Sequence, residues 1–268
     1  MAGLVSAQMV LASGPNFPTI NDFLPPEILF QGTPFALNRI VLIRLIMTVV
    51  ILLVLGITTM RAKLIPGRWQ GAVEWMLGFV RNNIVYEVMG ERRGKRYVPM
   101  ITTMFMTIFL FNLCEVIPGA NIAATATIAM PLVFAFWTFF QYWIAAAREQ
   151  GLGKYLRHEL IPKGVPLPVL IIVLPMQLLD VLVVRPVSLM VRLFANMLAG
   201  YFILELCLAA AQYFLVNVTD KLMMPLGGFM LIAALVMTLF ESFVAALQAF
   251  IFATLSTVYI NLSYPEEA

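Results

Sequence analysis

The chain has 268 residues, of which 62% are apolar and only 12% are charged, and its mean hydropathy is +0.93. Soluble domains carry about twice that share of charged residues, so the composition excludes a water-soluble globular fold and predicts a membrane protein. The net charge of +3 is small, and the basic residues gather in loops, which argues against nucleic-acid binding.

The first 38 residues contain no Lys or Arg. The charged start of a secretory signal is therefore missing, and residues 1–37 are expected to form an external N-terminal segment of the mature protein. Cys114 and Cys207 both lie in apolar runs, so packing in the core is expected of them rather than a disulfide.

The first predicted membrane span is the run LIMTVVILLVLGITTM at residues 45–60, extended back to Asn38. Together they supply the roughly 20 apolar residues that a span requires, and Arg39 and Arg44 would lie near one interface. Residues 61–97 follow with eight basic side chains against three acidic ones. The positive-inside rule places this loop in the cytoplasm.

Apolar residues recur at helical spacing within that loop. They are Val73, Met76, Leu77, Val80, Ile84 and Val88. Polar residues such as Glu74, Arg81 and Glu87 fall on other faces of the same helix. An interfacial amphipathic helix near residues 70–90 is therefore predicted, rather than another span.

Two more spans are predicted over residues 98–117 and 122–147, joined by an uncharged external turn. The loop over residues 148–165 has four basic residues (Arg148, Lys154, Arg157 and Lys163) and is again expected in the cytoplasm. Three spans precede this loop, so the N-terminus is predicted outside and the tail, residues 263–268, in the cytoplasm.

The last two apolar segments, residues 167–216 and 225–262, are too long for ordinary spans. A helix over the second would be roughly 57 Å long, about twice the hydrocarbon thickness, so strong tilt is predicted. A re-entrant break beside Arg185 and Pro186 is an open alternative for the first. The sequence thus predicts an all-α polytopic membrane protein, with about five crossing helices and one interfacial helix in a single membrane domain over residues 38–262.

Five charged side chains fall inside these last two segments. They are Asp180, Arg185, Arg192, Glu205 and Glu241. Because Arg or Asp at a helix centre costs about 2.5–3.5 kcal/mol on insertion scales, each is a candidate functional residue. Helical spacing joins Ser188 and Asn196 to the two arginines in one polar stripe, and it makes Gln248 face the same way as Glu241.

Structural roles compete with functional ones for most of these residues. Arg185 could form an ion pair with Asp180, and Glu241 could be the structural partner of another polar group. Asn196 and Gln248 could form hydrogen bonds between helices. Arg192 differs, because guanidinium stays charged at any relevant pH and no acidic residue of its own helix is within reach.

Standard catalytic chemistry is not indicated. The single histidine, His158, lies in a loop, and the HEL that it begins does not continue as HExxH. No GxxxxGK[ST] phosphate-binding loop occurs, and a serine nucleophile would lack a histidine base within the membrane. The chain is expected to be non-catalytic by itself, with no cofactor and no metal.

The stretch RPVSLMVRLFANMLAG at residues 185–200, followed by LQAFIFATLSTVYINL at residues 247–262, resembles the bacterial form of subunit a of F-type ATP synthases. The pieces FNLCEVIPG, ANIAATATIAMPL and PKGVPLPVL match the same family. The resemblance covers most of the chain from about residue 24. It implies a stator subunit in the bacterial plasma membrane that carries protons between two aqueous half-channels and a ring of small proteolipid (c) subunits. The peripheral stalk (b) subunits and the rest of the complex would be further partners.

The same resemblance assigns roles to individual residues. Arg192 would be the arginine that ionises ring carboxylates, with Asn196 one turn further along and Gln248 facing it from the last helix. Glu241 and Asn112 would belong to the external half-channel.

The chain departs from the family pattern at two positions. Tyr201 stands where many members have His or Glu, so the usual partner of Glu241 is absent and Glu205 is the expected substitute. Gln177 stands where many members have Glu, which raises Asp180 as the replacement at the cytoplasmic exit.

A stand-alone secondary transporter with a charged midplane site is the alternative function. Such folds commonly show internal repeats, and none is visible between the halves of this chain. The sequence leaves open whether the ion is H⁺ or Na⁺, how large the ring is and in which direction the complex works.

The predicted topology can be tested by chemical labelling. A cysteine in place of Ala2 should react with a membrane-impermeant maleimide added outside intact cells, because the basic loop holds residues 61–97 in the cytoplasm. The unsubstituted chain serves as the control for its two native cysteines. Labelling that requires access of the reagent to the cytoplasm would reverse the orientation.

Overall fold

The computed structural model describes residues 27–29, 37–63, 66–117, 125, 127–160, 167–217 and 223–265. Helices dominate it, as predicted. In chain order they are α2 (Arg39–Met60), α3 (Arg68–Val80), η2 (Arg81–Tyr86), α4 (Glu87–Gly94), α5 (Val98–Leu113), α6 (Ala129–Glu149), α7 (Leu152–Leu160), α8 (Leu167–Leu179), η3 (Asp180–Val184), α9 (Arg185–Gln212), η4 (Tyr213–Asn217) and α10 (Met224–Leu262). The three η segments are π-helical.

Two very short strands precede these helices. β1 (Glu27–Leu29) pairs antiparallel with β2 (Leu37–Asn38), a feature that the sequence analysis did not predict. Asn38 then caps α2, because its side-chain oxygen accepts the Val41 amide at 3.0 Å. Most of the predicted external segment, residues 1–37, lies outside the described residues.

Four helical segments are long and apolar enough to cross a membrane: Arg39–Met60, Ala129–Glu149, Val169–Val216 and Met224–Leu262. The fifth apolar helix, α5, has 16 residues and is about 24 Å long, which is short for a span. The chain is therefore a multi-pass membrane protein of the expected helix content.

The predicted ends of the second and third spans were wrong by several residues. α5 stops at Leu113, and the chain turns through short-range bonds such as Glu115 N to Asn112 O at 3.1 Å. α6 begins only at Ala129, close before Pro131. Proline is tolerated in the first turn of a helix but not further inside, so the helix cannot extend far back from it.

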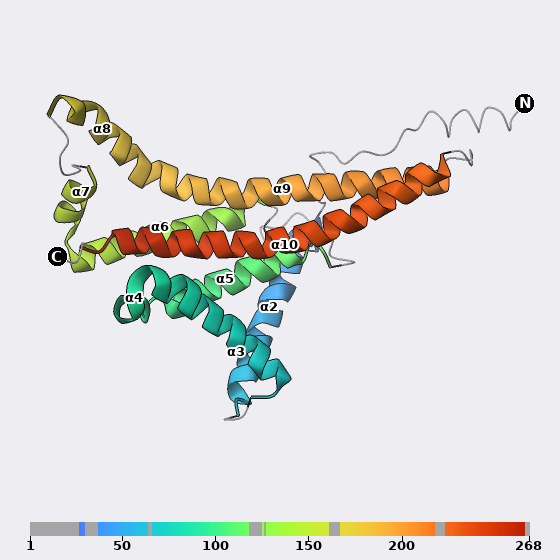
Figure 1. The fold of residues 1–268 in the computed structure, drawn as a ribbon, viewed down its shortest axis with the longest axis horizontal. Helices are drawn as coiled ribbons and strands as arrows, with labels where there is room; N and C mark the ends of the chain where they lie inside the picture. The colour runs from blue at the N-terminus through green and yellow to red at the C-terminus, as the bar shows by residue number, and fades with distance from the viewer. Residues whose placement is uncertain are drawn as a thin grey trace, which may run out of the picture.

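The last two apolar segments form one long antiparallel hairpin. Residues 169–216 make a continuous helical stretch of 48 residues and α10 has 39. α9 and α10 lie side by side along the longest axis of the molecule, and α8 is set at an angle to α9 (Figure 1). The re-entrant break was wrong: the π-helical segment η3 lets the helix bend without interruption.

Small residues let α10 approach its neighbours closely. Its buried face carries Ala245, Ala249 and Ala253, followed by Ser256, and such residues bring helices together in membranes. The Ser256 hydroxyl also lies 3.1 Å from that of Thr138 on α6. One face of α10 consequently packs against α9, α5 and α6.

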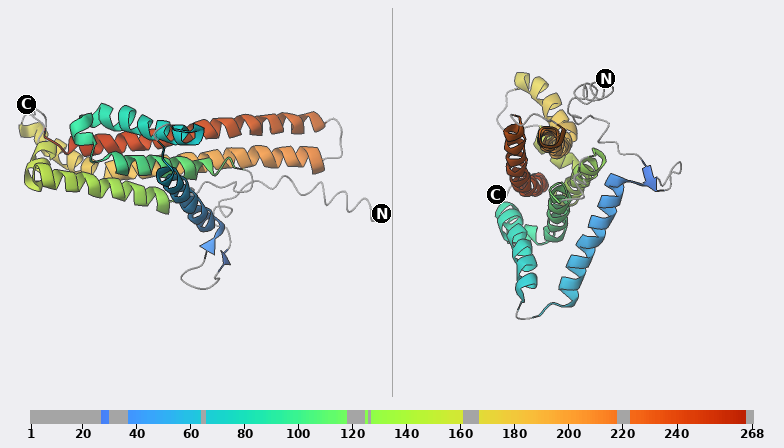
Figure 2. Two further views of the ribbon diagram at one scale, coloured as in Figure 1. Left: turned by 90° about the horizontal axis from the view of Figure 1, so that it is seen from below. Right: turned by 90° about the vertical axis from the view of Figure 1, so that its right-hand side faces the viewer.

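The amphipathic helix predicted near residues 70–90 is present as α3, η2 and α4. Val73, Val80 and Ile84 are buried, whereas Glu74 and Arg81 are exposed. The wider π-helical turn of η2 shifts the register of the buried face, so Val85 and Met89 are buried as well. This segment packs against α5 and α10 (Figure 2).

The C-terminal end of α10 is fixed to this amphipathic segment. Tyr264 and Tyr97 place their hydroxyls 3.1 Å apart, and the Arg93 guanidinium lies 5.2 Å from the centre of the Tyr264 ring. Asn261 donates a hydrogen bond to the Val88 carbonyl at 3.1 Å. The C-terminal end of α10 thus lies beside the loop that carries eight basic residues.

Candidate functional site

The polar stripe of α9 runs along the border between its buried and exposed faces. The buried face is formed by Leu189, Leu193 and Met197. Along the stripe, Ser188 and Asn196 are half-buried and Arg192 is exposed, whereas Arg185 is buried. Helical spacing therefore placed the four residues correctly, and the difference between the two arginines comes from the neighbours that cover them.

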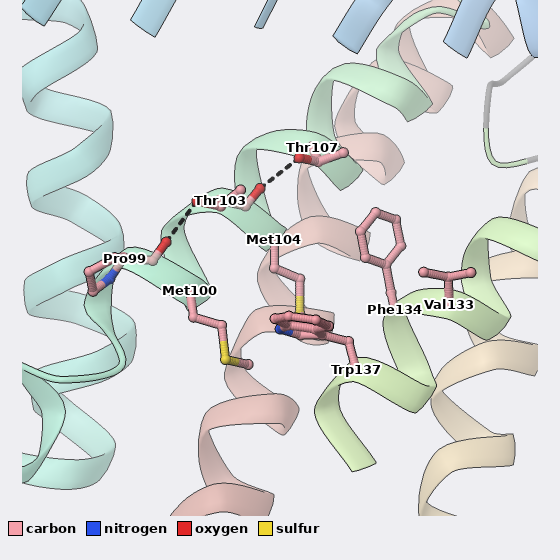
Figure 3. Close-up of a pocket in the computed structure, with 8 residues that line it drawn as sticks. All are labelled: Pro99, Met100, Thr103, Met104, Thr107, Val133, Phe134 and Trp137. Atoms are coloured by element: carbon pink, nitrogen blue, oxygen red, sulfur yellow. Dashed lines mark hydrogen bonds between the residues drawn. The ribbon is translucent and has the colours of Figure 1, made fainter. Parts of the chain in front are cut away.

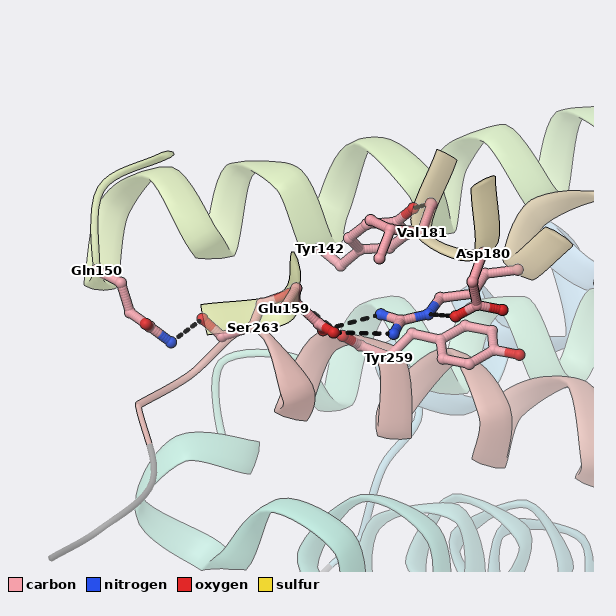
Figure 4. A network of polar contacts seen from close by, with 8 residues as sticks. Tyr142, Gln150, Glu159, Asp180, Val181, Tyr259 and Ser263 are labelled. Atoms are coloured by element: carbon pink, nitrogen blue, oxygen red, sulfur yellow. Dashed lines mark hydrogen bonds and ion pairs between the residues drawn. The ribbon is translucent and has the colours of Figure 1, made fainter. Parts of the chain in front are cut away.

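Arg185 is covered and fully paired. Its Nε donates to Asp180 Oδ2 at 3.0 Å, and Nη1 and Nη2 donate to the two carboxylate oxygens of Glu159 at 3.1 Å each. The centre of the Tyr259 ring of α10 lies 5.8 Å from the central carbon of the guanidinium. The ion pair with Asp180, which sequence left as an alternative, is present, whereas Glu159 was not predicted (Figure 4).

Arg192 makes no hydrogen bond or ion pair with any residue that the structure describes. The exposed side of α9 next to it is apolar and is formed by Val187, Val191, Ala195 and Ala199. A charged side chain on an apolar membrane face is costly unless it meets a partner. The partner of Arg192 therefore has to be sought outside the described part of this chain.

Glu241 is buried between α10 and α9. Only 4% of it is exposed, and its Oε2 atom has no hydrogen-bond partner within the described residues. The carboxylate lies directly against Gly200 of α9, so closely that a methyl group on Gly200 would overlap it. Gly200 therefore supplies the space that the carboxylate occupies.

A second buried carboxylate, Glu115, lies near Glu241. Glu115 follows the end of α5 and is 3% exposed, its Oε1 atom has no hydrogen-bond partner in the described part of the chain, and its charge interacts with that of Glu241. The sequence did not predict Glu115 as a site residue, although FNLCEVIPG contains it, because a charge near the end of a predicted span can ordinarily reach the membrane interface. Asn112, one turn earlier, accepts a hydrogen bond from the Thr125 hydroxyl at 2.5 Å.

The remaining candidates surround these groups in different ways. Tyr201 is buried with Met197 and Val244, and Glu205 is half-buried. Within the described residues, no hydrogen bond joins Glu205 to Glu241. Gln248 is 4% exposed, and its buried Nε2 atom has no hydrogen-bond partner among the described residues. The interhelical hydrogen bond that the sequence allowed for Gln248 is therefore not formed within the described part of the chain.

An apolar pocket of about 510 Å³ lies between α5 and α6 (Figure 3). Met100, Met104 and Trp137 line it, and the hydroxyls of Thr103 and Thr107 donate to carbonyls of their own helix at 2.8 Å each. It offers no titratable group. The chemistry of the site is therefore assigned to the charged residues of the hairpin rather than to this pocket.

The sequence profile of the family described as ATP synthase A chain matches residues 41–261. ATP synthase subunit a of Rhodococcus erythropolis is 39% identical over 246 residues, which cover 92% of this chain and 89% of that protein. The subunit a of Pseudarthrobacter chlorophenolicus is 32% identical over 244 residues, 91% of each chain. That of Streptomyces lividans is 31% identical over 224 residues, 84% of this chain and 78% of its own.

The close packing of Glu241 on Gly200 gives a stability prediction. Gly200→Ala should destabilise the protein by about 1–3 kcal/mol, because overpacking a close contact forces side chains or backbone to move. In a Glu241→Ala background the same substitution should have little effect, since the overlapping carboxylate is gone. Thermal unfolding in detergent measures both. Gly228→Ala on α10, where an added methyl group meets nothing within 4 Å, is the matched control, and equal losses at both glycines would contradict the contact.

Proposed function

The chain belongs to the ATP synthase subunit a family, and from this membership we propose that it is the proton-carrying stator subunit of an F-type ATP synthase. In this role it carries protons between two aqueous half-channels and a rotating ring of small c subunits, and it catalyses no reaction by itself. The b subunits of the peripheral stalk would hold it fixed against the ring. The proposed location is the bacterial plasma membrane, with the N-terminus outside.

The observation that carries this proposal is the exposed Arg192 on the apolar face of α9. An unpaired arginine at the centre of a span costs about 2.5–3.5 kcal/mol on insertion scales. A carboxylate on a neighbouring polypeptide at the same depth removes that cost. The ring subunits of such a complex supply one carboxylate after another, and exposed Val187, Val191 and Ala195 provide a smooth apolar surface for them to pass.

The mechanism follows from the cost of charge in hydrocarbon. A ring carboxylate that enters lipid has to be neutral, because the ionised form is expensive there, so it leaves the stator protonated. Arg192 favours the ionised form as the carboxylate passes and drives its proton into one half-channel. The fixed positive charge also blocks direct proton flow between the channels, so protons cross only by rotation of the ring.

The external half-channel is assigned to Glu241 with Glu115, Asn112 and Tyr201. Carboxylates bind and release protons, and two of them with interacting charges provide more than one step along a path. Gln248 lies about 10 Å further along α10, toward the depth of Arg192. Glu115 is proposed as a partner of Glu241 beside Glu205, the substitute expected from the sequence, because the charge of Glu115 interacts with that of Glu241.

The cytoplasmic exit is assigned to Asp180, in keeping with Gln177 at the usual glutamate position. The Asp180 side chain is 41% exposed. Asp180 begins η3, and it shares Arg185 with Glu159 of α7, a helix in the loop that is expected in the cytoplasm. Arg185 and Ser188 would then line the way between Asp180 and Arg192, and Asn196 would lie one turn beyond Arg192, on the side of Glu241. A stand-alone secondary transporter gains no support from the relatives, all of which are named as ATP synthase subunits.

Arg192→Ala should abolish ATP-driven proton pumping by the assembled complex, because nothing then forces the ring carboxylates to ionise. Arg192→Lys should restore little, since an ammonium lacks the planar fork of guanidinium and can lose its proton when desolvated. Passive proton leak should persist or rise, because the barrier between the channels is removed. Arg148→Ala, which removes an exposed arginine at the end of α6, is the control. Normal coupled pumping by an assembled Arg192→Ala complex would refute the proposal.

Glu241→Ala should slow proton conduction through membranes stripped of the soluble ATPase sector, while the subunit stays in the complex. The physical reason is the loss of a buried proton-binding group from the external path. Conduction and the amount of subunit in the membrane are measured together, with exposed Glu87→Ala as the control. Unchanged conduction would remove Glu241 from the path, and loss of the subunit would indicate a structural role instead.

A further inference from the structure

The bend between α8 and α9 is built around unusual backbone. In the π-helical segment η3 the α-helical hydrogen bonds give way to the wider π-helical ones, and Pro186, just beyond it, has no N–H to donate. The Val181 carbonyl is instead satisfied by Tyr142 of α6, whose buried hydroxyl donates to it at 2.6 Å. A bend of this kind needs fixed contacts from outside the helix to hold one geometry.

Arg185 gathers those contacts at a single guanidinium. Its fork binds both oxygens of Glu159 on α7, and its Nε binds Asp180 within η3 (Figure 4). A two-pronged arginine–carboxylate pair fixes orientation as well as distance. α7 is thereby fixed to the bend, although Glu159 and Arg185 are 26 residues apart in the chain.

The two carboxylates of this cluster differ in their access to water. Both oxygens of Glu159 are engaged by Arg185, and its side chain is 14% exposed. Asp180 uses only Oδ2, and its side chain is 41% exposed; its other oxygen makes no hydrogen bond within the described residues. Asp180 is therefore the member of the cluster that can exchange a proton with solvent.

We propose that Glu159 and Arg185 are positioning residues of the proton exit, which hold Asp180 at the cytoplasmic mouth and set the charge around it. This inference rests on the proposed function and extends it to Glu159, a residue outside the hairpin. The other titratable groups facing the cluster are the phenols of Tyr142, Tyr155 and Tyr259. One arginine against two carboxylates leaves the cluster with one net negative charge when both are ionised.

Substitutions at Glu159 and Arg185 change the charge around Asp180 in opposite ways. Removing the charge of Glu159 makes the surroundings of Asp180 more positive, so its proton leaves more easily. Removing the charge of Arg185 makes them more negative, so the proton is held more tightly. The two changes therefore act in opposite directions, which a purely structural contribution of the same ion pair would not do.

The test uses the assembled complex in inverted membrane vesicles stripped of the soluble sector, where the cytoplasmic face is accessible. Proton conduction is measured as a function of pH on that face. Glu159→Gln should move the half-maximal point to lower pH by about one unit, and Arg185→Gln should move it to higher pH by about as much. Arg185→Lys keeps the charge but loses the fork, so it should lower conduction without moving the half-maximal point.

Controls and contrary results separate this inference from the proposed function. Glu149→Gln removes an exposed acidic group at the end of α6 and should leave the pH profile unchanged. Shifts in the same direction, or no shift in assembled Glu159→Gln, would overturn the inference, and so would loss of assembly in both Glu159→Gln and the milder Glu159→Asp. In each of these cases normal pumping by the wild type and its loss in Arg192→Ala would leave the proposed function intact. Wild-type membranes that conduct no protons would overturn both.

Discussion

A guanidinium cannot lose its proton at ordinary pH, so an arginine inside a membrane protein has to be paired with a negative charge or solvated by water. Arg185 and Arg192 lie on the same side of α9, seven positions apart, and differ in their partners. Arg185 has three hydrogen bonds to two carboxylates. Arg192 has none within the described chain. One arginine thus stabilises this fold, and the other is available to a partner.

The same division appears in the packing of the hairpin. The inner face of α10 is made of small residues such as Ala245, Ala249 and Ala253, which allow close approach to α5 and α9. Its outer face carries large exposed side chains, among them Leu235, Leu239 and Phe243. Close packing inside fixes the position of Glu241 against Gly200, while the apolar outside can face lipid or, in the proposed function, the ring. In that proposal, one face of the helix provides rigidity and the opposite face provides a surface for a moving partner.

Sequence predicted the features that depend on local spacing. The helical content, the buried face of α3 through Ile84 and the great length of the last two segments all follow from apolar runs and periodicity within one helix. The pairing of Arg185 with Asp180 was one of two alternatives that the sequence left open. The interactions that it missed join distant parts of the chain. They are the ion pair of Glu159 with Arg185, the charge interaction of Glu115 with Glu241 and the hydrogen bond of the Tyr142 hydroxyl to the Val181 carbonyl. The π-helical segments were also missed, because tertiary contacts rather than residue preferences hold their extra residue in place.

The positions of the carboxylates along the hairpin explain why a moving partner is required in the proposed function. Gly200, which marks the place of Glu241, lies eight residues beyond Arg192, or about 12 Å along the helix, and Asp180 lies twelve residues before it, or about 18 Å. Their separation of roughly 30 Å equals the hydrocarbon thickness. With the strong tilt predicted from the length of these segments, taken as about 60°, roughly 15 Å of that distance is depth and roughly 26 Å is displacement within the membrane plane. A proton that enters beside Glu241 therefore reaches Asp180 only by being carried sideways past Arg192, and a turning ring of carboxylates performs that displacement.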